Sequence, residues 1–171
     1  MRLALFLPQR NFRDETVSMV RMIMGKWGVN CDIVSYGARC VGSHGAVYPS
    51  AARPTNDLPL SYDGIILADG DGIEEQKIYD YRPLLDIITG FNERKKPIIS
   101  IGNATKILAR ANIIKGRRVS VGDVETKRLV TLFYGMPSQN GAEASENLVT
   151  IRDSKSVEVS AEQVLQHIGV M

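Results

Sequence analysis

The chain has 171 residues, of which 44% are hydrophobic and 23% are charged, and its formal net charge is +2. This length suits one domain with its own core, and so small a charge argues against a nucleic-acid partner or an anionic membrane surface. No apolar stretch approaches the roughly 20 residues that cross a bilayer. We therefore expect one globular domain over residues 1–171, with neither nucleic acid nor membrane as a partner.

The first half of the chain begins with the apolar run 2–7, which Pro8 interrupts at once, and this favours a strand over a signal peptide. A helical stripe over 14–27 follows, with Asn11 or Asp14 as its cap and Gly28 at its end. The remaining expected elements of this half are strands at 31–36 and 63–68 and a region of loops with short strands at 37–60.

The second half continues the alternation of strands and helices. The strands are nearly continuous apolar runs, which is typical of a parallel sheet that helices cover on both faces. Ligands of such sheets bind at the carboxyl ends of the strands. The segment 123–140 fits a helix or a strand, and both stay open. The other expected elements are helices at 79–94, 103–114 and 160–168 and strands at 97–101, 118–121 and 147–152.

Two loops at the expected carboxyl edge carry polar residues. The first, residues 8–15, brings Glu15 into the first turn of a helix, where the helix dipole favours a negative charge. The second, residues 68–75, contains Gly70 and Gly72, which permit close backbone approach. It lacks the spaced ligands of a calcium loop, so we expect no metal, and a solvated acidic loop is the alternative. Its four acids are Asp69, Asp71, Glu74 and Glu75.

The third loop lies in the stretch "SIGNATKIL", residues 100–108, where a buried strand turns sharply into a helix. Such a turn often presents a nucleophile, but here it holds Gly102 and Asn103. Amide groups at the start of the helix remain able to bind an anion or a carbonyl. We expect Ser100 to stay inside the strand and Thr105 to cap the helix.

Cysteine and histidine are scarce in this chain. Cys31 and Cys40 form neither a CxxC pair nor a zinc spacing, and two isolated thiols suit a reducing cytoplasm. We expect Cys31 to be a buried strand residue and Cys40 a loop thiol. His44 and His167 are the only histidines, so a catalytic Ser/His or Cys/His pair is difficult to form. We expect a surface position for His167.

Five stretches of the chain resemble the ThiJ/PfpI superfamily, especially its intracellular-protease branch. The resemblance implies a flavodoxin-like three-layer α/β fold, with a mostly parallel sheet, of the class I glutamine amidotransferase type. It also implies a homodimer or a higher oligomer. The similar stretches are "RNFRDETVSMVRMIMGKWG", "VGSHGAVYPSAA", "YDGIILADGDGIEE", "KKPIISIGNATKILARANIIKGRRV" and "ENLVTIRDS".

The resemblance assigns the family's reactive cysteine and the histidine after it to Gly102 and Asn103. It assigns the acid that assists the cysteine to Glu15, and the acid that reaches a neighbouring subunit's histidine to Glu74. Without a thiolate at the turn, the family's peptidase, amidase and glyoxal chemistry loses its nucleophile. The resemblance thus implies a strand-to-helix turn that keeps the family's backbone geometry but lacks its reactive cysteine.

Three functions stay open at this point. The first is a homo-oligomer that binds a small polar ligand or a partner without catalysis. The second is a hydratase or lyase that uses Glu15 as its base, and the third is a hydrolase with Cys40 as a relocated nucleophile. We expect no cofactor. The predicted ligand pocket consists of Glu15, Gly70, Gly72, Gly102 and Asn103.

Overall fold

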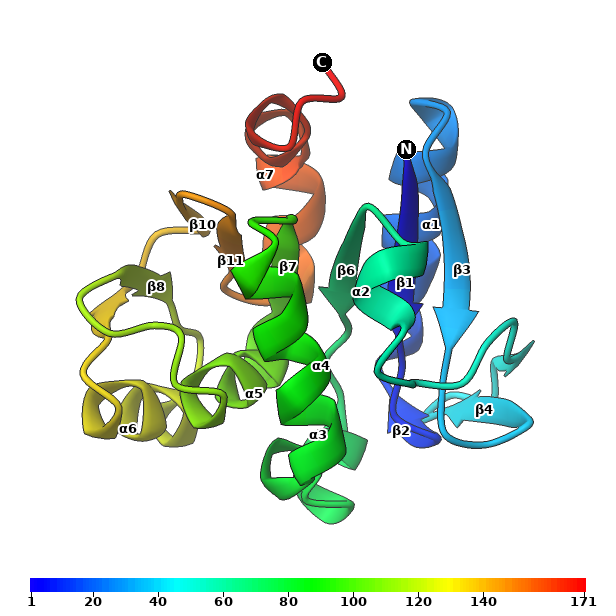
Figure 1. Ribbon diagram of the computed structural model, residues 1–171, viewed down its shortest axis with the longest axis horizontal. Helices are drawn as coiled ribbons and strands as arrows, with labels where there is room; N and C mark the ends of the chain where they lie inside the picture. The colour runs from blue at the N-terminus through cyan, green and yellow to red at the C-terminus, as the bar shows by residue number, and fades with distance from the viewer.

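Six strands pair into a central sheet in the order β10-β11-β7-β6-β1-β3. Five of them run parallel, and only β10 is antiparallel, to β11. The computed structural model describes residues 1–171 (Figure 1). The strands are β1 (Arg2–Phe6), β3 (Asn30–Val34), β6 (Gly64–Leu67), β7 (Ile98–Ile101), β10 (Ala142–Ser145) and β11 (Leu148–Ile151).

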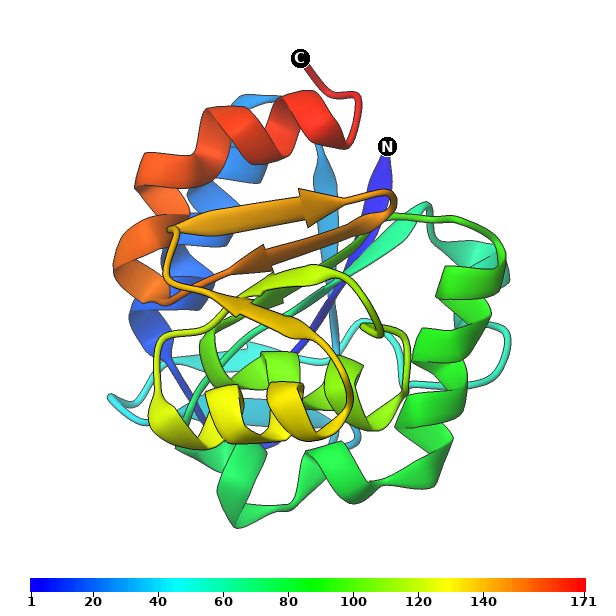
Figure 2. The ribbon, with the colours of Figure 1, turned by 90° about the vertical axis from the view of Figure 1, so that its left-hand side faces the viewer.

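Helices cover both faces of this sheet. Figure 2 shows α1 and α7 on one side of the strands and α4 on the other. The expected flavodoxin-like three-layer α/β fold is therefore confirmed. No helix has both the length and the apolar character needed to cross a membrane. The covering helices are α1 (Asp14–Lys26), α2 (Leu58–Ser61), α4 (Arg82–Glu93), α5 (Thr105–Arg110) and α7 (Ser154–His167).

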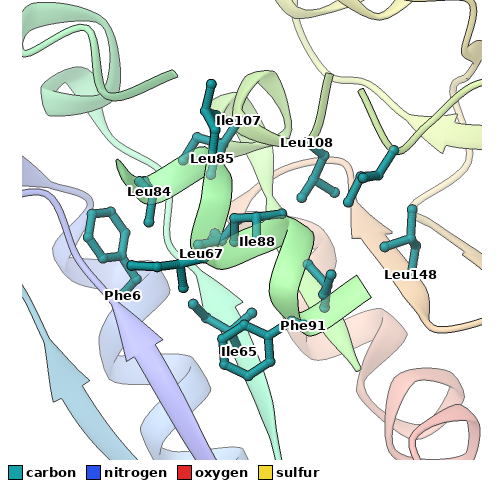
Figure 3. Close-up of a cluster of buried hydrophobic side chains, with 14 of the residues drawn as sticks. Phe6, Ile65, Leu67, Leu84, Leu85, Ile88, Phe91, Ile107, Leu108 and Leu148 are labelled. Atoms are coloured by element: carbon teal, nitrogen blue, oxygen red, sulfur yellow. The ribbon is translucent and has the colours of Figure 1, made fainter. Parts of the chain in front are cut away.

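Successive strand residues divide between two hydrophobic cores, because side chains alternate across a sheet. Ile65 and Leu67 of β6 pack into the core beneath α4, whereas Ile66 packs into the core beneath α1 and α7. Figure 3 shows the first core, where Ile88 and Phe91 of α4 lie over the sheet. Burying one such side chain stabilises the fold by about 1.5–3 kcal/mol.

Short elements complete the chain and settle its ambiguous parts. The segment 123–140 contains a helix followed by a strand, so both expectations hold in part, and 37–60 contains two short strands and one helical turn. The remaining elements are β2 (Arg10–Phe12), β4 (Arg39–Gly42), β5 (Val47–Pro49), α3 (Asp71–Glu75), β8 (Arg118–Ser120), α6 (Val124–Leu132), β9 (Met136–Ser138) and the 3-10 turns Ile78–Asp80 and Gly102–Ala104.

Helix boundaries account for the main differences from the sequence analysis. The last helix begins at Ser154 rather than at residue 160, because the carboxylate of Asp153 accepts the Ser156 N–H at 2.9 Å and caps it. The helix expected over 103–114 is shorter: a 3-10 turn precedes α5, which ends at Arg110.

The start of α1 also differs from the prediction. Neither Asn11 nor Asp14 caps the helix, which begins after Arg13 without a side-chain cap. The carboxylate of Asp14 instead accepts the backbone N–H groups of His44 and Ala46, each at 2.9 Å. Asp14 therefore fixes the β4–β5 loop against α1. Gly28 follows the helix with a φ of +74°, as its assignment to the helix end predicts.

Candidate functional site

The turn between β7 and α5 lies at the carboxyl edge of the sheet, in the lower part of Figure 1. Gly102 begins the turn with a φ of +56°, in the left-handed region that favours glycine. The strand before it is fully buried, and α5 follows after one 3-10 turn. The backbone therefore has the sharp strand-to-helix geometry that the sequence predicts, with no side chain at its tip.

Asp69 fills the space beside Gly102. It follows β6, the strand next to β7, and only 6% of its side chain is exposed. Its Oδ2 accepts a hydrogen bond from Nε of Arg13 at 3.1 Å, and its backbone carbonyl accepts the Arg13 N–H at 2.9 Å. The Arg13 side chain is half exposed.

Burial raises the pKa of the Asp69 carboxyl above its usual value. Thr16 and Arg13 oppose this effect without cancelling it. The Thr16 hydroxyl lies near the carboxylate, yet it makes no well-aligned hydrogen bond, and Oδ1 of Asp69 has no partner either. The turn thus contains a buried acid with one unused acceptor atom.

Asn103 fastens the turn to the loop after β6. Its Oδ1 accepts the Gly70 N–H at 3.1 Å, and its Nδ2 donates to the Gly70 carbonyl at 2.8 Å. This use of the Gly70 amide removes a donor that an anionic ligand would need. The Gly70 amide is therefore unavailable to a ligand, whereas the sequence analysis expected anion binding at the amides that begin the helix after Gly102.

Gly70 and Gly72 serve close packing within the chain. Gly70 has a φ of +147°, and a β-carbon there would collide with the backbone of Asn11. A β-carbon at Gly72 would collide with the carbonyl of Arg10. Both glycines therefore allow the loop after β6 to lie against β2, which explains them without a ligand.

A polar cleft of about 480 Å³ opens beside the turn, bordered by α3, α5 and the start of α6. Lys106 of α5 contributes its ammonium group although only 6% of its side chain is exposed. The other lining residues are Asp71, Glu74, Glu75, Asn103, Asp123, Val124 and Glu125.

Lys106 forms ion pairs with two of the carboxylates in this cleft. Its Nζ lies 3.0 Å from Glu74 and 3.4 Å from Glu125, and it also lies over the Tyr79 ring, 5.5 Å from the centroid. Hydrogen bonds from Lys106 and from the Tyr79 hydroxyl lower the pKa of Glu74. Burial, together with Glu74, raises the pKa of Tyr79 to about 12. Glu74 is thus committed to partners within its own chain.

Glu15 does not line this cleft. Its carboxylate lies 3.2 Å from Nδ1 of His44, and the two side chains are 55% and 72% exposed. The three atoms nearest to a side chain at Gly102 all belong to Asp69. The structure therefore pairs Glu15 with His44 at the surface.

Cys40 is a buried residue of β4, so its prediction as a loop thiol was wrong. Its Sγ lies 3.5 Å from the Tyr48 carbonyl, and burial raises its pKa to about 11. Cys31 lies in β3 as predicted but is only partly buried, and burial raises its pKa to about 11 as well. Both thiols are therefore protonated and poorly nucleophilic at neutral pH.

Sequence reasoning missed three residues that shape this region. In the sequence, nothing distinguishes Arg13 and Lys106 from other charged residues, and Asp69 is one of four acids in its loop. Its position directly after the buried run of β6 is the one signal that sets Asp69 apart. Thr105 was expected to cap its helix, but its hydroxyl lies 2.7 Å from that of buried Ser100 instead. His167 is exposed in the last turn of α7, as predicted.

One family model matches nearly the whole chain. The sequence model described as "DJ-1/PfpI family" matches residues 1–166. An uncharacterized protein of Methanocaldococcus jannaschii is 26% identical over 113 residues, which are 66% of this chain and 55% of the relative. The match therefore spans about half the length of that curated relative.

Several solved structures share the fold. A ThiJ/PfpI domain protein from Brachyspira murdochii gives a TM-score of 0.91 at 17% identity, covering 99% of this chain and 97% of that one. A putative protease I from Bacteroides thetaiotaomicron gives 0.81 at 16% identity, with 98% of each chain covered. DJ-1 of Schizosaccharomyces pombe gives 0.84 at 14% identity, covering 99% and 92%.

Proposed function

This chain belongs to the DJ-1/PfpI family, and we propose that it is a non-peptidase member that binds a small polar ligand or a partner. The observation that carries this proposal is the turn at Gly102. The resemblance assigns the reactive cysteine to this position, and the residue here has no side chain. Covalent catalysis by a thiolate at the turn then has no nucleophile.

The two catalytic alternatives lack support at their key residues. A hydrolase with Cys40 as nucleophile needs an accessible thiolate, but this thiol is buried and its pKa is raised to about 11. A hydratase or lyase with Glu15 as base needs that carboxylate beside the turn at Gly102. Glu15 instead pairs with exposed His44. Neither alternative is favoured by a specific contact.

We place the ligand in the polar cleft beside the turn. Asn103 belongs both to the predicted pocket and to this cleft, and Lys106 supplies a fixed positive charge at its wall. Five carboxylates line the same cleft. A small ligand with amine or hydroxyl donors suits this lining better than an anionic ligand, which the carboxylates would repel.

The oligomeric state and the location are parts of the same proposal. We propose one domain that forms a homodimer in the cytoplasm, as the family resemblance implies. Glu74 is already held by Lys106 and Tyr79 of its own chain, which weakens the case for a further contact through it. A monomer at micromolar concentration in light scattering would contradict the dimer.

The first experiment measures turnover and ligand binding on the same protein. We expect purified wild type to show no peptidase, amidase or methylglyoxal turnover. A screen of small amines and polyols should raise the melting temperature, since a ligand at 100 times its Kd adds about 2.7 kcal/mol of stability. The shift should be smaller in Asp71→Asn, which removes a cleft carboxylate that Lys106 does not pair with.

Two variants separate the alternatives if turnover appears. Loss of that activity in Glu15→Gln but not in Cys40→Ala would establish Glu15 as the base. The opposite result would establish Cys40 as the nucleophile. Either result would contradict the non-enzymatic proposal.

A further inference from the structure

The side-chain space at position 102 belongs to another residue. A β-carbon at Gly102 would lie 2.8 Å from Oδ2 of Asp69 and 3.0 Å from its Cβ. Both distances are shorter than nearly all contacts that real β-carbons make. The turn is therefore occupied, although its own residue has no side chain.

Asp69 has little freedom to move out of this space. Its Oδ2 is held by Nε of Arg13 at 3.1 Å, and its backbone carbonyl accepts the Arg13 N–H at 2.9 Å. Its side chain is almost wholly buried, since only 6% is exposed. Interiors are close-packed, so displacing this carboxylate would also displace its neighbours.

We propose that Asp69 determines the chemistry of this turn: its carboxyl occupies the space that a side chain at position 102 would need, so the turn offers a buried acid in place of a side-chain nucleophile. Asp69 and Gly102 are then a matched pair. A side chain at position 102 requires the loss of the one at position 69.

Thiol reactivity tests the pairing directly. Gly102→Cys is made alone and together with Asp69→Gly, and each folded protein is treated with a chromogenic disulfide reagent. We expect the double variant to react at least about tenfold faster than Gly102→Cys alone, because reactivity requires an accessible thiolate. The wild-type rate, which reports Cys31 and Cys40, is subtracted from both.

A matched control separates shape from charge. Asp69→Asn retains nearly the same volume, so the asparagine amide should still obstruct the thiol in the Asp69→Asn/Gly102→Cys double variant. A slow rate there, beside a fast rate with Asp69→Gly, supports occupation of the space. Equal rates for Gly102→Cys with and without Asp69→Gly would overturn the proposal.

A second pair of variants applies if Gly102→Cys does not melt cooperatively. Gly102→Ala should lower the melting temperature by less in the Asp69→Gly background than in the wild type. The strain of placing alanine at the left-handed φ of position 102 is the same in both backgrounds. The difference between the two decreases in melting temperature therefore reports the contact with Asp69 alone. Equal drops would overturn the pairing.

These readouts are independent of the proposed function. Turnover by the wild type would contradict the non-enzymatic role and leave the thiol rates interpretable. Conversely, a fast reaction of the thiol in Gly102→Cys alone would contradict the occupation of the turn by Asp69. It would have no bearing on whether the wild type shows turnover.

Discussion

The turn at Gly102 and the cleft at Lys106 are neighbours along the chain, yet their polar groups differ in exposure. Those of the turn are bonded within the fold, and those of the cleft are largely exposed. At the turn, Asp69 is buried and Asn103 makes both of its hydrogen bonds to Gly70 within the fold. In the cleft, the carboxylates of Glu74 and Glu125 are 45% and 72% exposed, and only Lys106 is buried.

This difference indicates what each region contributes. Buried polar groups that bind one another stabilise a structure and leave few atoms for a ligand. Exposed charges contribute little to stability and remain available. Substitutions at the turn should therefore change the stability of the protein, whereas substitutions in the cleft should change local pKa values and ligand binding.

The largest effect is expected from Asn103→Leu. This change removes the partners of both the N–H and the carbonyl of Gly70, so we expect a loss of roughly 2–3 kcal/mol, at about 1 kcal/mol or more for each lost hydrogen bond. Urea denaturation measures it. Asn103→Asp retains the acceptor for the Gly70 N–H and should lose less. A loss within about 0.5 kcal/mol of zero for Asn103→Leu would show that the two hydrogen bonds do not fasten the turn.

A pH-dependent effect is expected from Asp69→Asn. Because the pKa of Asp69 is raised in the folded protein, the folded state binds more protons than the unfolded state above the ordinary value of 3.8. The contribution of Asp69 to wild-type stability is therefore complete below that value and falls as pH rises through the folded pKa.

Denaturation of wild type and Asp69→Asn from pH 4 to pH 7 checks this sign. The variant should gain stability relative to wild type as pH rises, because its amide has no proton to release. The other carboxyls titrate in both proteins and cancel in the difference. A relative loss with rising pH would mean that Arg13 outweighs burial at this carboxyl.

A smaller effect on stability is expected from Lys106→Met, which retains an unbranched side chain in the buried space. We expect a loss of about 1 kcal/mol, because the partners Glu74 and Glu125 stay solvated. The pKa of Glu74 should rise toward its usual value, and NMR titration measures this. Lys106→Arg, which retains the charge, should leave that pKa low. An unchanged pKa in Lys106→Met would contradict the pairing.

The smallest effect is expected from the exposed pair in the first loop. Glu15→Gln should change the free energy of unfolding by less than about 0.5 kcal/mol, since exposed ion pairs contribute little. Asp14→Asn is the matched comparison, because the Asp14 carboxylate accepts two backbone N–H groups. A larger loss in Glu15→Gln than in Asp14→Asn would reverse the ranking of these neighbours.

The sequence predicted the sheet well because buried parallel strands are continuous apolar runs. The residues of β6 and β7 show this, since each strand is fully buried between two helical layers. Helix ends were predicted less well. The run Asp153-Ser154-Lys155-Ser156 resembles a loop in composition, although Asp153 is the cap of a helix.

The candidate site was predicted only in part. Gly102 and Asn103 were identified from the strand-to-helix turn itself, which is a local feature. The partner of Asn103 is Gly70, which is 33 residues earlier in the chain, and the partner of Asp69 is Arg13, which is 56 residues earlier. Such pairings depend on which strands become neighbours, and no local pattern in the sequence records that.

The sequence by itself determined the layered α/β fold, the sharp turn at Gly102 and the absence of a side chain there. These follow from hydrophobic periodicity and from the conformational freedom of glycine, which act over a few residues. Only the tertiary structure decided that Asp69 fills the turn, that Lys106 pairs with Glu74, and that Glu15 faces His44. Those outcomes depend on burial and distance, which arise when β6 and β7 pair and α1, α3 and α5 pack around their carboxyl ends.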